Sequence, residues 1–377
     1  MKKIIVAILF SLINTTSQLA WADRCDYDPG SGPVNLTVPL SVANISVGAD
    51  VPVGSTVHTL KVIGSTGKQP WLVCRPEGTS NGFSIDQYLS LTNAPALVPG
   101  WTGNYAGAVF QTGVPGLGVA IVNNDGTTAN QAITTSAVKK WTTPVGNTAY
   151  HFYYGNSFTL HFIKTGPMSA GTVNGAQLPT VLLTTGSVTP VVNIPDTPYR
   201  LNFSGSLNVI AASCTTPDVN VNMGKWEINS WFGTGKANAT SWVPFDIRLT
   251  NCPAFQGNYS NPSAPPTYHT GSGFAAGTWV TNSIKIRFTP SNGVIDAAQG
   301  IMSLDNSADS AQGIGIQIAD GKVSPAPVNL NQTLDKNMAS NAVGTVLLPF
   351  SARYIKTGGT VSPGVANGKV IFNISYY

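Results

Sequence analysis

The chain has 377 residues, only 10% of them charged, and a formal net charge of +4. Average globular proteins carry about 25% charged residues, so this chain is unusually poor in charge. A net charge this small gives no basis for binding nucleic acid or an anionic membrane. Glycine, proline, threonine, serine and asparagine are abundant in place of charged residues, and this composition favours short strands joined by uncharged turns. We therefore expect an all-β fold.

The first 22 residues predict an export signal. Two lysines precede an apolar run from Ile4 to Ile13, and Ala20 and Ala22 are small residues around a cleavage point. The run is shorter than the roughly 20 residues that cross a bilayer, and no later segment is apolar enough to be an anchor. We expect a mature protein that begins at Asp23 and has no membrane span. Loss of the two lysines lowers its net charge by two, to +2.

Four cysteines divide between the two halves of the chain, as Cys25 with Cys74 and Cys214 with Cys252. In an oxidising compartment two local disulfides are the simplest of three possible connectivities. The spacings fit neither a zinc site nor a redox CxxC motif. One disulfide in each half indicates two domains.

Two prolines in segment 193–198 predict a short, stiff linker. It separates a first domain at 23–192 from a second at 199–377. About seven short alternating segments in the second half predict an immunoglobulin-like sandwich. The expected strands are Val34–Leu40, Thr56–Ile63, Trp71–Cys74, Gly118–Val122, Ala149–Tyr154 and Phe158–Lys164, then Leu201–Val209, Phe245–Leu249, Ile284–Phe288, Ile314–Ile318, Val346–Tyr354 and a last strand from Val370.

The last fourteen residues predict a strand that no further strand follows. Val370, Phe372, Ile374 and the penultimate Tyr376 fall on alternate positions, so one face of this strand is apolar. An uncovered apolar edge is a template for pairing with another chain, and most soluble proteins blunt it. We therefore expect the last strand to pair with a strand of another molecule. The alternative is an ordinary last strand of a closed sandwich.

These features resemble the C-terminal signature of chaperone–usher pilus subunits, with Gly364 fourteenth from the end. The Cys214 to Cys252 spacing and the segments Gly313–Ile316 and Tyr354–Gly359 resemble landmarks of the same family. In that family the pilin domain lacks its last strand, which a periplasmic chaperone and then the adjacent subunit supply. The resemblance implies an incomplete immunoglobulin-like domain, delivered to an outer-membrane usher, with the Tyr377 carboxylate anchored by basic residues of the chaperone. Its implied chaperone and donor-strand interface is Gly364, Val370, Phe372, Ile374, Tyr376 and Tyr377.

The first half resembles the lectin-like domain of two-domain fimbrial tip adhesins, such as the type 1 fimbrial adhesin family. Cys25 at the third mature position, Cys74 at a strand end and the segment Thr112–Val119 carry this resemblance. It implies a jelly-roll or immunoglobulin-like sandwich that binds a glycan or glycoprotein receptor, without a cofactor or metal. Ordinary pilins begin with a free apolar tail that is donated to a neighbour, and Cys25 leaves no room for one. The resemblance therefore implies a cell-surface adhesin at the fimbrial tip.

Glycan binding requires planar amide or carboxyl groups and an aromatic face. The type 1 fimbrial adhesin, which this half resembles, binds mannose and has an Asn-Asp pair just after its second cysteine. Here Arg75-Pro76-Glu77 follows Cys74, so mannose specificity is not expected. Arg75, Glu77 and Lys164 would instead suit a charged glycan or a protein receptor. The candidate ligand-binding residues are Trp101, Asn104, Tyr105, Asn124, Asp125, Arg75 and Glu77.

We do not expect an enzyme. The chain has no HExxH, GxSxG or cysteine–histidine signature. The acids Asp86, Asp125 and Glu77 have no spacing that predicts the carboxylate pair of a glycosidase. Two alternatives stay open: a two-domain structural minor pilin without a receptor, and a secreted carbohydrate-active enzyme.

Overall fold

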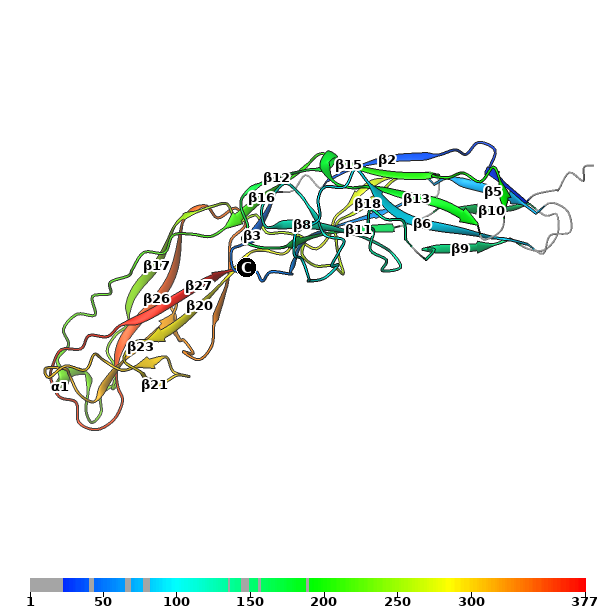
Figure 1. Ribbon diagram of the computed structural model, residues 1–377. Coiled ribbons are helices and arrows are strands. Elements are labelled where there is room, and N and C mark those ends of the chain that lie inside the picture. The colour runs from blue at the N-terminus through cyan, green and yellow to red at the C-terminus, as the bar shows by residue number, and fades with distance from the viewer. Residues whose placement is uncertain are drawn as a thin grey trace, which may run out of the picture.

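The computed structural model describes residues 23–40, 44–64, 69–76, 82–134, 136–143, 149–154, 157–187 and 190–377. The predicted signal at 1–22 and the candidate Glu77 lie outside this part of the chain. The described chain forms two β-sandwiches arranged end to end, and the C-terminus lies at their junction (Figure 1). Each sandwich has its own hydrophobic core. The all-β, two-sandwich prediction is confirmed.

The first sandwich packs four sheets around one core. A single turn of 3-10 helix, η2 (Gly175–Gln177), follows strand β12. The first sheet has the order β10 (Tyr150–Tyr153), β5 (Trp71–Arg75), β1 (Asp23–Tyr27) and β14 (Val191–Val192), and the second has the order β2 (Val34–Pro39), β15 (Tyr199–Ser204), β13 (Thr180–Ser187), β6 (Ser84–Thr92) and β9 (Lys139–Thr142). The third sheet has the order β12 (Gly171–Asn174), β16 (Ser206–Ala212) and β3 (Ile45–Gly48). The fourth sheet has the order β19 (Gly273–Ala275), β18 (Thr267–His269), β4 (Thr56–Ile63), β11 (Ser157–Lys164), β8 (Leu117–Asn123) and β7 (Phe110–Gln111).

The second sandwich packs a larger sheet against a three-stranded sheet. A short helix, α1 (Ile228–Trp231), precedes its first strand. The larger sheet has the order β17 (Val243–Cys252), β26 (Gly344–Lys356), β23 (Ile314–Asp320), β22 (Ile301–Met302) and β21 (Val294–Asp296), with β24 (Ala326–Pro327) on β23, and the smaller has the order β25 (Leu334–Asn337), β20 (Ser283–Pro290) and β27 (Val370–Tyr376).

Both predicted disulfides are present. Cys25 on β1 is bonded to Cys74 on β5, where the two residues lie opposite each other in an antiparallel pair. Cys214 is bonded to Cys252, the last residue of β17. Each disulfide therefore closes a loop within one half of the chain. In the part of the chain that the structure describes, no helix is long and apolar enough to cross a membrane.

Strands β15 and β16 differ from the predicted domain division. Leu201 and Phe203 of β15, and Leu207 of β16, are buried in the first core rather than the second. β15 pairs with β2 and β13, and β16 pairs with β12 and β3. The alternating pattern correctly predicts strands, but these strands complete sheets of the first sandwich. We therefore propose a boundary after Ala212 instead of a linker at 193–198.

A hairpin from the second half crosses the boundary in the opposite direction. Strand β18 lies among the strands of the first sandwich (Figure 1). It pairs in parallel with β4, and β19 pairs with β18. Tyr268 of this hairpin packs against the first core. Residues between Cys252 and β20 thus add edge strands to a sheet of the first sandwich.

Candidate functional site

Strand β27 has one open edge. It pairs antiparallel with β20, and Ser283 and Tyr377 exchange backbone hydrogen bonds of 3.0 and 2.8 Å. In an antiparallel pair, residues next to a hydrogen-bonded pair direct their backbone groups to the other side. The backbone groups of Val370, Phe372 and Ile374 therefore point away from β20. Among the described residues they have no backbone partner on that side.

The side chains of β27 alternate as predicted. Val370, Phe372 and Ile374 are half-buried and pack against the second core, whereas Ile371 is 51% exposed on the opposite face. A strand completing a closed core would bury its inward-facing side chains fully. The partial burial of this row leaves apolar surface that side chains of another segment could cover. An open backbone edge beside a half-covered core is a site for one added strand.

The other three predicted interface residues are already engaged within the chain. Tyr376 is buried and stacks on Phe255 with ring centroids 6.3 Å apart. The main-chain oxygen of Tyr377 accepts hydrogen bonds from the Ser283 N–H and from Asn282 Nδ2, at 3.0 and 3.2 Å. Gly364 lies before β27 against the backbone of residues 309–311, where a Cβ would be 2.4 Å from Asp309 O. The accessible part of the interface is therefore Val370 to Ile374.

The predicted loop at Trp101 to Tyr105 folds down onto the first sandwich. The Trp101 indole N–H donates to the Asn104 carbonyl oxygen at 2.8 Å, and the Tyr105 ring stacks on His161 of β11 with centroids 5.2 Å apart. Trp101 and Tyr105 are half-buried on a small cluster of Val109, Ala120 and Ile163. The Asn104 residue is exposed. The rings of Trp101 and Tyr105 therefore pack against the protein itself, and the exposed amide of Asn104 is the group of this loop that a ligand can contact.

The remaining candidates lie in two separate places. Asn124 and Asp125 are exposed in the turn after β8, where Asp125 Oδ1 accepts from the Thr127 N–H at 2.8 Å. Arg75 is exposed at the end of β5, which belongs to a different sheet. The structure therefore brings Trp101, Asn104 and Tyr105 together and leaves Arg75 outside this group.

Lys164 corrects the suggestion of a charged-glycan contact. It is only 4% exposed, and its Nζ donates to the Ala49 carbonyl at 2.5 Å and the Gly48 carbonyl at 3.4 Å. Burial lowers the pKa of Lys164, and the nearby Asp50 carboxylate raises it in part. Its amine holds the turn after β3 and is not available to a receptor.

Two surfaces of the first sandwich lie outside the candidate ligand-binding residues, although Trp141 and Tyr153 of one of them are aromatic residues of the kind that sugar binding uses. Lys139 Nζ lies 4.8 Å from the Trp141 ring centroid and 5.2 Å from that of Tyr153, and Trp71 packs beside Tyr153. The pairing of β5 with β10 places Trp71 beside Tyr153, and Lys139 and Trp141 come from β9 of a different sheet, so residue spacing could not reveal this group. The second surface is a shallow hollow of about 410 Å³ lined by Asn93, Ala94, Pro95, Gln111, Thr112, Gly113 and Gln177.

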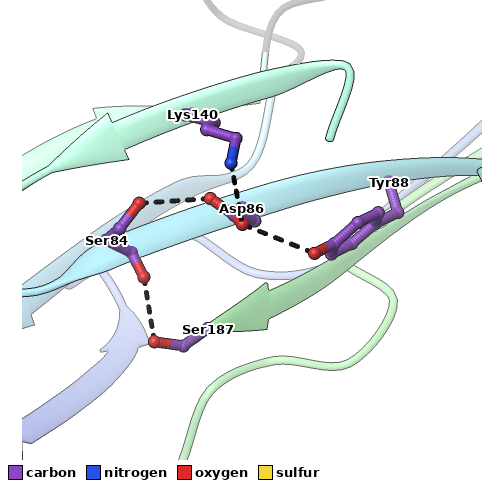
Figure 2. A network of polar contacts seen from close by, with 5 residues as sticks. All are labelled: Ser84, Asp86, Tyr88, Lys140 and Ser187. Carbon is purple, nitrogen blue, oxygen red and sulfur yellow. Dashed lines mark hydrogen bonds and ion pairs between the residues drawn. The ribbon is translucent and has the colours of Figure 1, made fainter. Parts of the chain in front are cut away.

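A buried carboxylate lies on β6 of the first sandwich. Asp86 is 2% exposed and accepts hydrogen bonds from the Ser84 and Tyr88 hydroxyls at 3.1 and 3.4 Å, while Lys140 Nζ is 3.6 Å away (Figure 2). Ser187 also donates to the backbone carbonyl of Ser84. The Lys140 ammonium thus balances the charge of Asp86, and two hydroxyls donate hydrogen bonds to its oxygens. A buried carboxylate with such partners is typical of a structural role. Within the described residues no cluster of three or more His, Cys, Asp and Glu side chains could hold a metal.

Comparison with known proteins relates the chain to bacterial fimbriae. Residues 201–377 match the family described as Fimbrial protein. A "Fimbria adhesin protein" of Klebsiella pneumoniae is 25% identical over the full length of both chains. A "Fimbrial subunit type 1" of Salmonella typhimurium is 28% identical over 47% of this chain and 81% of its own.

Two solved structures of adhesins also align with the chain. The CupB6 tip adhesin of Pseudomonas aeruginosa aligns over 94% of this chain and 93% of its own, with 16% identity and a TM-score of 0.33. The receptor-binding domain of the plasmid-borne adhesin MrkD1P of Klebsiella pneumoniae aligns over 51% of this chain and 98% of its own, with 17% identity and a TM-score of 0.30.

Proposed function

We propose that this protein is a fimbrial tip adhesin, since its residues 201–377 match the family described as Fimbrial protein. The first sandwich binds a receptor at the cell exterior, and the second joins the protein to the fimbria by accepting a strand. The chaperone supplies that strand in the periplasm, and the adjacent pilus subunit supplies it in the fibre. The observation that carries the proposal is the open edge of β27 beside its half-buried row of apolar side chains.

The second core supports strand acceptance at another place. Val219 and Met223 lie in a stretch without strand pairing between Thr215 and α1, and both are only partly buried against the same core. Covering partly exposed apolar area stabilises a protein by about 25 cal/mol per Å². A donated strand with apolar side chains on one face would gain this energy together with a ladder of backbone hydrogen bonds.

The first described strand supports a position at the tip. Asp23–Tyr27 forms β1, paired with β5 and β14, and Cys25 within it is disulfide-bonded to Cys74. This segment is built into the first sandwich, so it is not available for donation to a neighbouring subunit. A subunit that accepts a strand without donating one belongs at the end of the fibre.

A glycan is the receptor class that the first sandwich suits best. Asn104 presents an exposed, uncharged amide in the Trp101 loop, and the shallow hollow is lined by the amides of Asn93, Gln111 and Gln177. Amide groups both donate and accept hydrogen bonds, as sugar hydroxyls do. The same chemistry binds oligosaccharides displayed on a glycoprotein.

A glycan array with the mature full-length chain, stabilised by its chaperone, tests the proposal. We expect binding to a defined set of glycans, and a loss of at least fivefold in affinity in Asn104→Ala or Gln177→Ala. Asn331→Ala is a matched control, because Asn331 is exposed on the second sandwich. Failure to bind any glycan or glycoprotein, with normal incorporation into fimbriae, would favour a structural minor pilin. Turnover of an oligosaccharide would favour an enzyme.

A further inference from the structure

The first sandwich covers the last position of the β27 edge. Tyr376 directs its backbone groups to the open side of β27, and both are bonded to Asp50, which follows β3. The Tyr376 N–H donates to Asp50 Oδ2 at 2.8 Å, and the Asp50 N–H donates to the Tyr376 carbonyl at 3.1 Å. The open edge therefore ends at Ile374, one outward-facing residue before the end of the strand.

The turn that carries Asp50 is held firmly from both sides. Lys164 Nζ donates to the carbonyls of Gly48 and Ala49. Ser46, in the same strand, donates from its backbone to Gly257 O at 2.8 Å and accepts at its side chain from the Gln256 N–H at 2.8 Å. The first domain's sheet and the second domain's loop thus fix the turn together, so it is a rigid boundary.

Gly48 allows this close approach. A Cβ at this position would lie 2.1 Å from the Tyr376 carbonyl oxygen, closer than any real contact. The end of β27 and the turn of the first domain are therefore in direct backbone contact. No strand can be inserted between them without moving one of the two domains.

We propose that the first domain sets the register and length of the donated strand: the Gly48–Asp50 turn is a stop, and the strand pairs with Val370, Phe372 and Ile374 only. This inference rests on the proposed acceptance of a strand by β27. It identifies the partner as one short extended segment with apolar residues at alternate positions. It also means that the end of the donated strand contacts the receptor-binding domain directly.

Hydrogen exchange with two synthetic peptides tests the stop. Both have valine at alternate positions; the short one reaches the position opposite Ile374, and the long one continues by two residues. On the mature full-length chain we expect the same number of protected peptide amides and affinities equal within about twofold. Each additional hydrogen bond would raise affinity about two- to tenfold. Extra protected amides and tighter binding of the long peptide would overturn the proposal.

Amide exchange in the unbound chain gives an independent measurement. We expect the Tyr376 amide to be protected while the Ile374 amide exchanges freely. Asp50→Ala should expose the Tyr376 amide, and Asp50→Asn, which keeps an acceptor oxygen, should not. If the Tyr376 amide exchanges as fast as the Ile374 amide in the wild-type chain, the Gly48–Asp50 turn does not close the edge of β27 and the proposal is wrong. If neither peptide binds, strand acceptance itself fails, and the Tyr376 measurement still decides whether the edge is closed there.

Discussion

His58 of the first sandwich packs edge-on against Tyr259 of the second half, with ring centroids 5.7 Å apart. The next residue on β4, Thr59, donates from its backbone N–H and its hydroxyl to the Tyr259 carbonyl, at 3.0 and 2.9 Å. His58 is 1% exposed, and within the described chain its Nδ1 has no hydrogen-bond partner. An ionisable ring is thus enclosed at the contact between the two halves.

This contact predicts a loss of stability in acid. Burial lowers the pKa of His58 from 6.5 to about 4. Between these values the unfolded chain binds a proton that the folded chain excludes, so stability present above pH 6.5 falls as the pH drops. The loss reaches about 3 kcal/mol near pH 4. Urea unfolding at pH 7 and pH 4 measures it.

The control for this prediction is His58→Phe, which keeps an aromatic ring and removes the titration. Its stability should fall less between pH 7 and pH 4. A smaller dependence should persist, because burial also lowers the pKa of His161. Equal pH dependence in the wild type and the variant would show that His58 is not the group responsible.

The hairpin β18–β19 predicts that the second half stabilises the first. Tyr268 packs against the first core, and Phe274, its partner across the hairpin, is 44% exposed. Tyr268→Ala should reduce the free energy of unfolding by about 1–3 kcal/mol, whereas Phe274→Ala should cost less than about 1 kcal/mol. Denaturant unfolding followed by tryptophan fluorescence distinguishes the two. Equal losses would mean that the hairpin does not seal the first core.

The revised domain boundary predicts how fragments behave. A fragment covering 23–192 lacks β15 and β16, so the buried residues of β2 and β13 lose their neighbours. We expect it to be unfolded or aggregated. A fragment covering 23–212 keeps both strands and should give a β-sheet circular dichroism spectrum with a cooperative thermal transition. Cooperative unfolding of the shorter fragment would restore the boundary at 193–198.

The two faces of β27 predict different effects on assembly. Phe372 points toward the second core and is half-buried, while its neighbour Ile371 is 51% exposed on the other face. Phe372→Ala should weaken chaperone capture by about 1–3 kcal/mol, because the donated strand loses an apolar neighbour. Ile371→Ala should have little effect. Co-purification with the chaperone from the periplasm compares them, and similar capture of both would place the interface elsewhere.

The sequence predicted local structure well and long-range pairing poorly. The alternation in Thr56–Ile63 and in Val370–Tyr376 depends on neighbouring residues only, so both strands are found as expected. The alternation of Leu201–Val209 also identified strands, but it carries no information about which core they join. Partner choice depends on residues far away in the chain, such as those of β2 and β3.

Candidate site residues show the same limit. The glycine-rich loop around Asn104 predicts that this residue is exposed. The packing of Trp101 and Tyr105 against Ala120 and Ile163 depends on tertiary structure, which the local sequence does not indicate. The bonds between Asp50 and Tyr376 join residues more than three hundred positions apart, and nothing near either residue in sequence indicates them. The segment between Cys252 and Ser283, with its Pro265-Pro266 pair and glycines, is a sequence feature that points to an irregular excursion there, which the structure shows as the docked hairpin.

Amide hydrogen exchange along β27, in the free mature chain and in its complex with the chaperone, tests the central claim most directly. We predict that the amides of Val370, Phe372 and Ile374 exchange rapidly in the free chain and become protected in the complex. Those of Ile371, Asn373 and Ser375, which face β20, should be protected in both. Protection of the first three amides in the free, monomeric chain would show that the second sandwich closes on its own and would contradict strand acceptance.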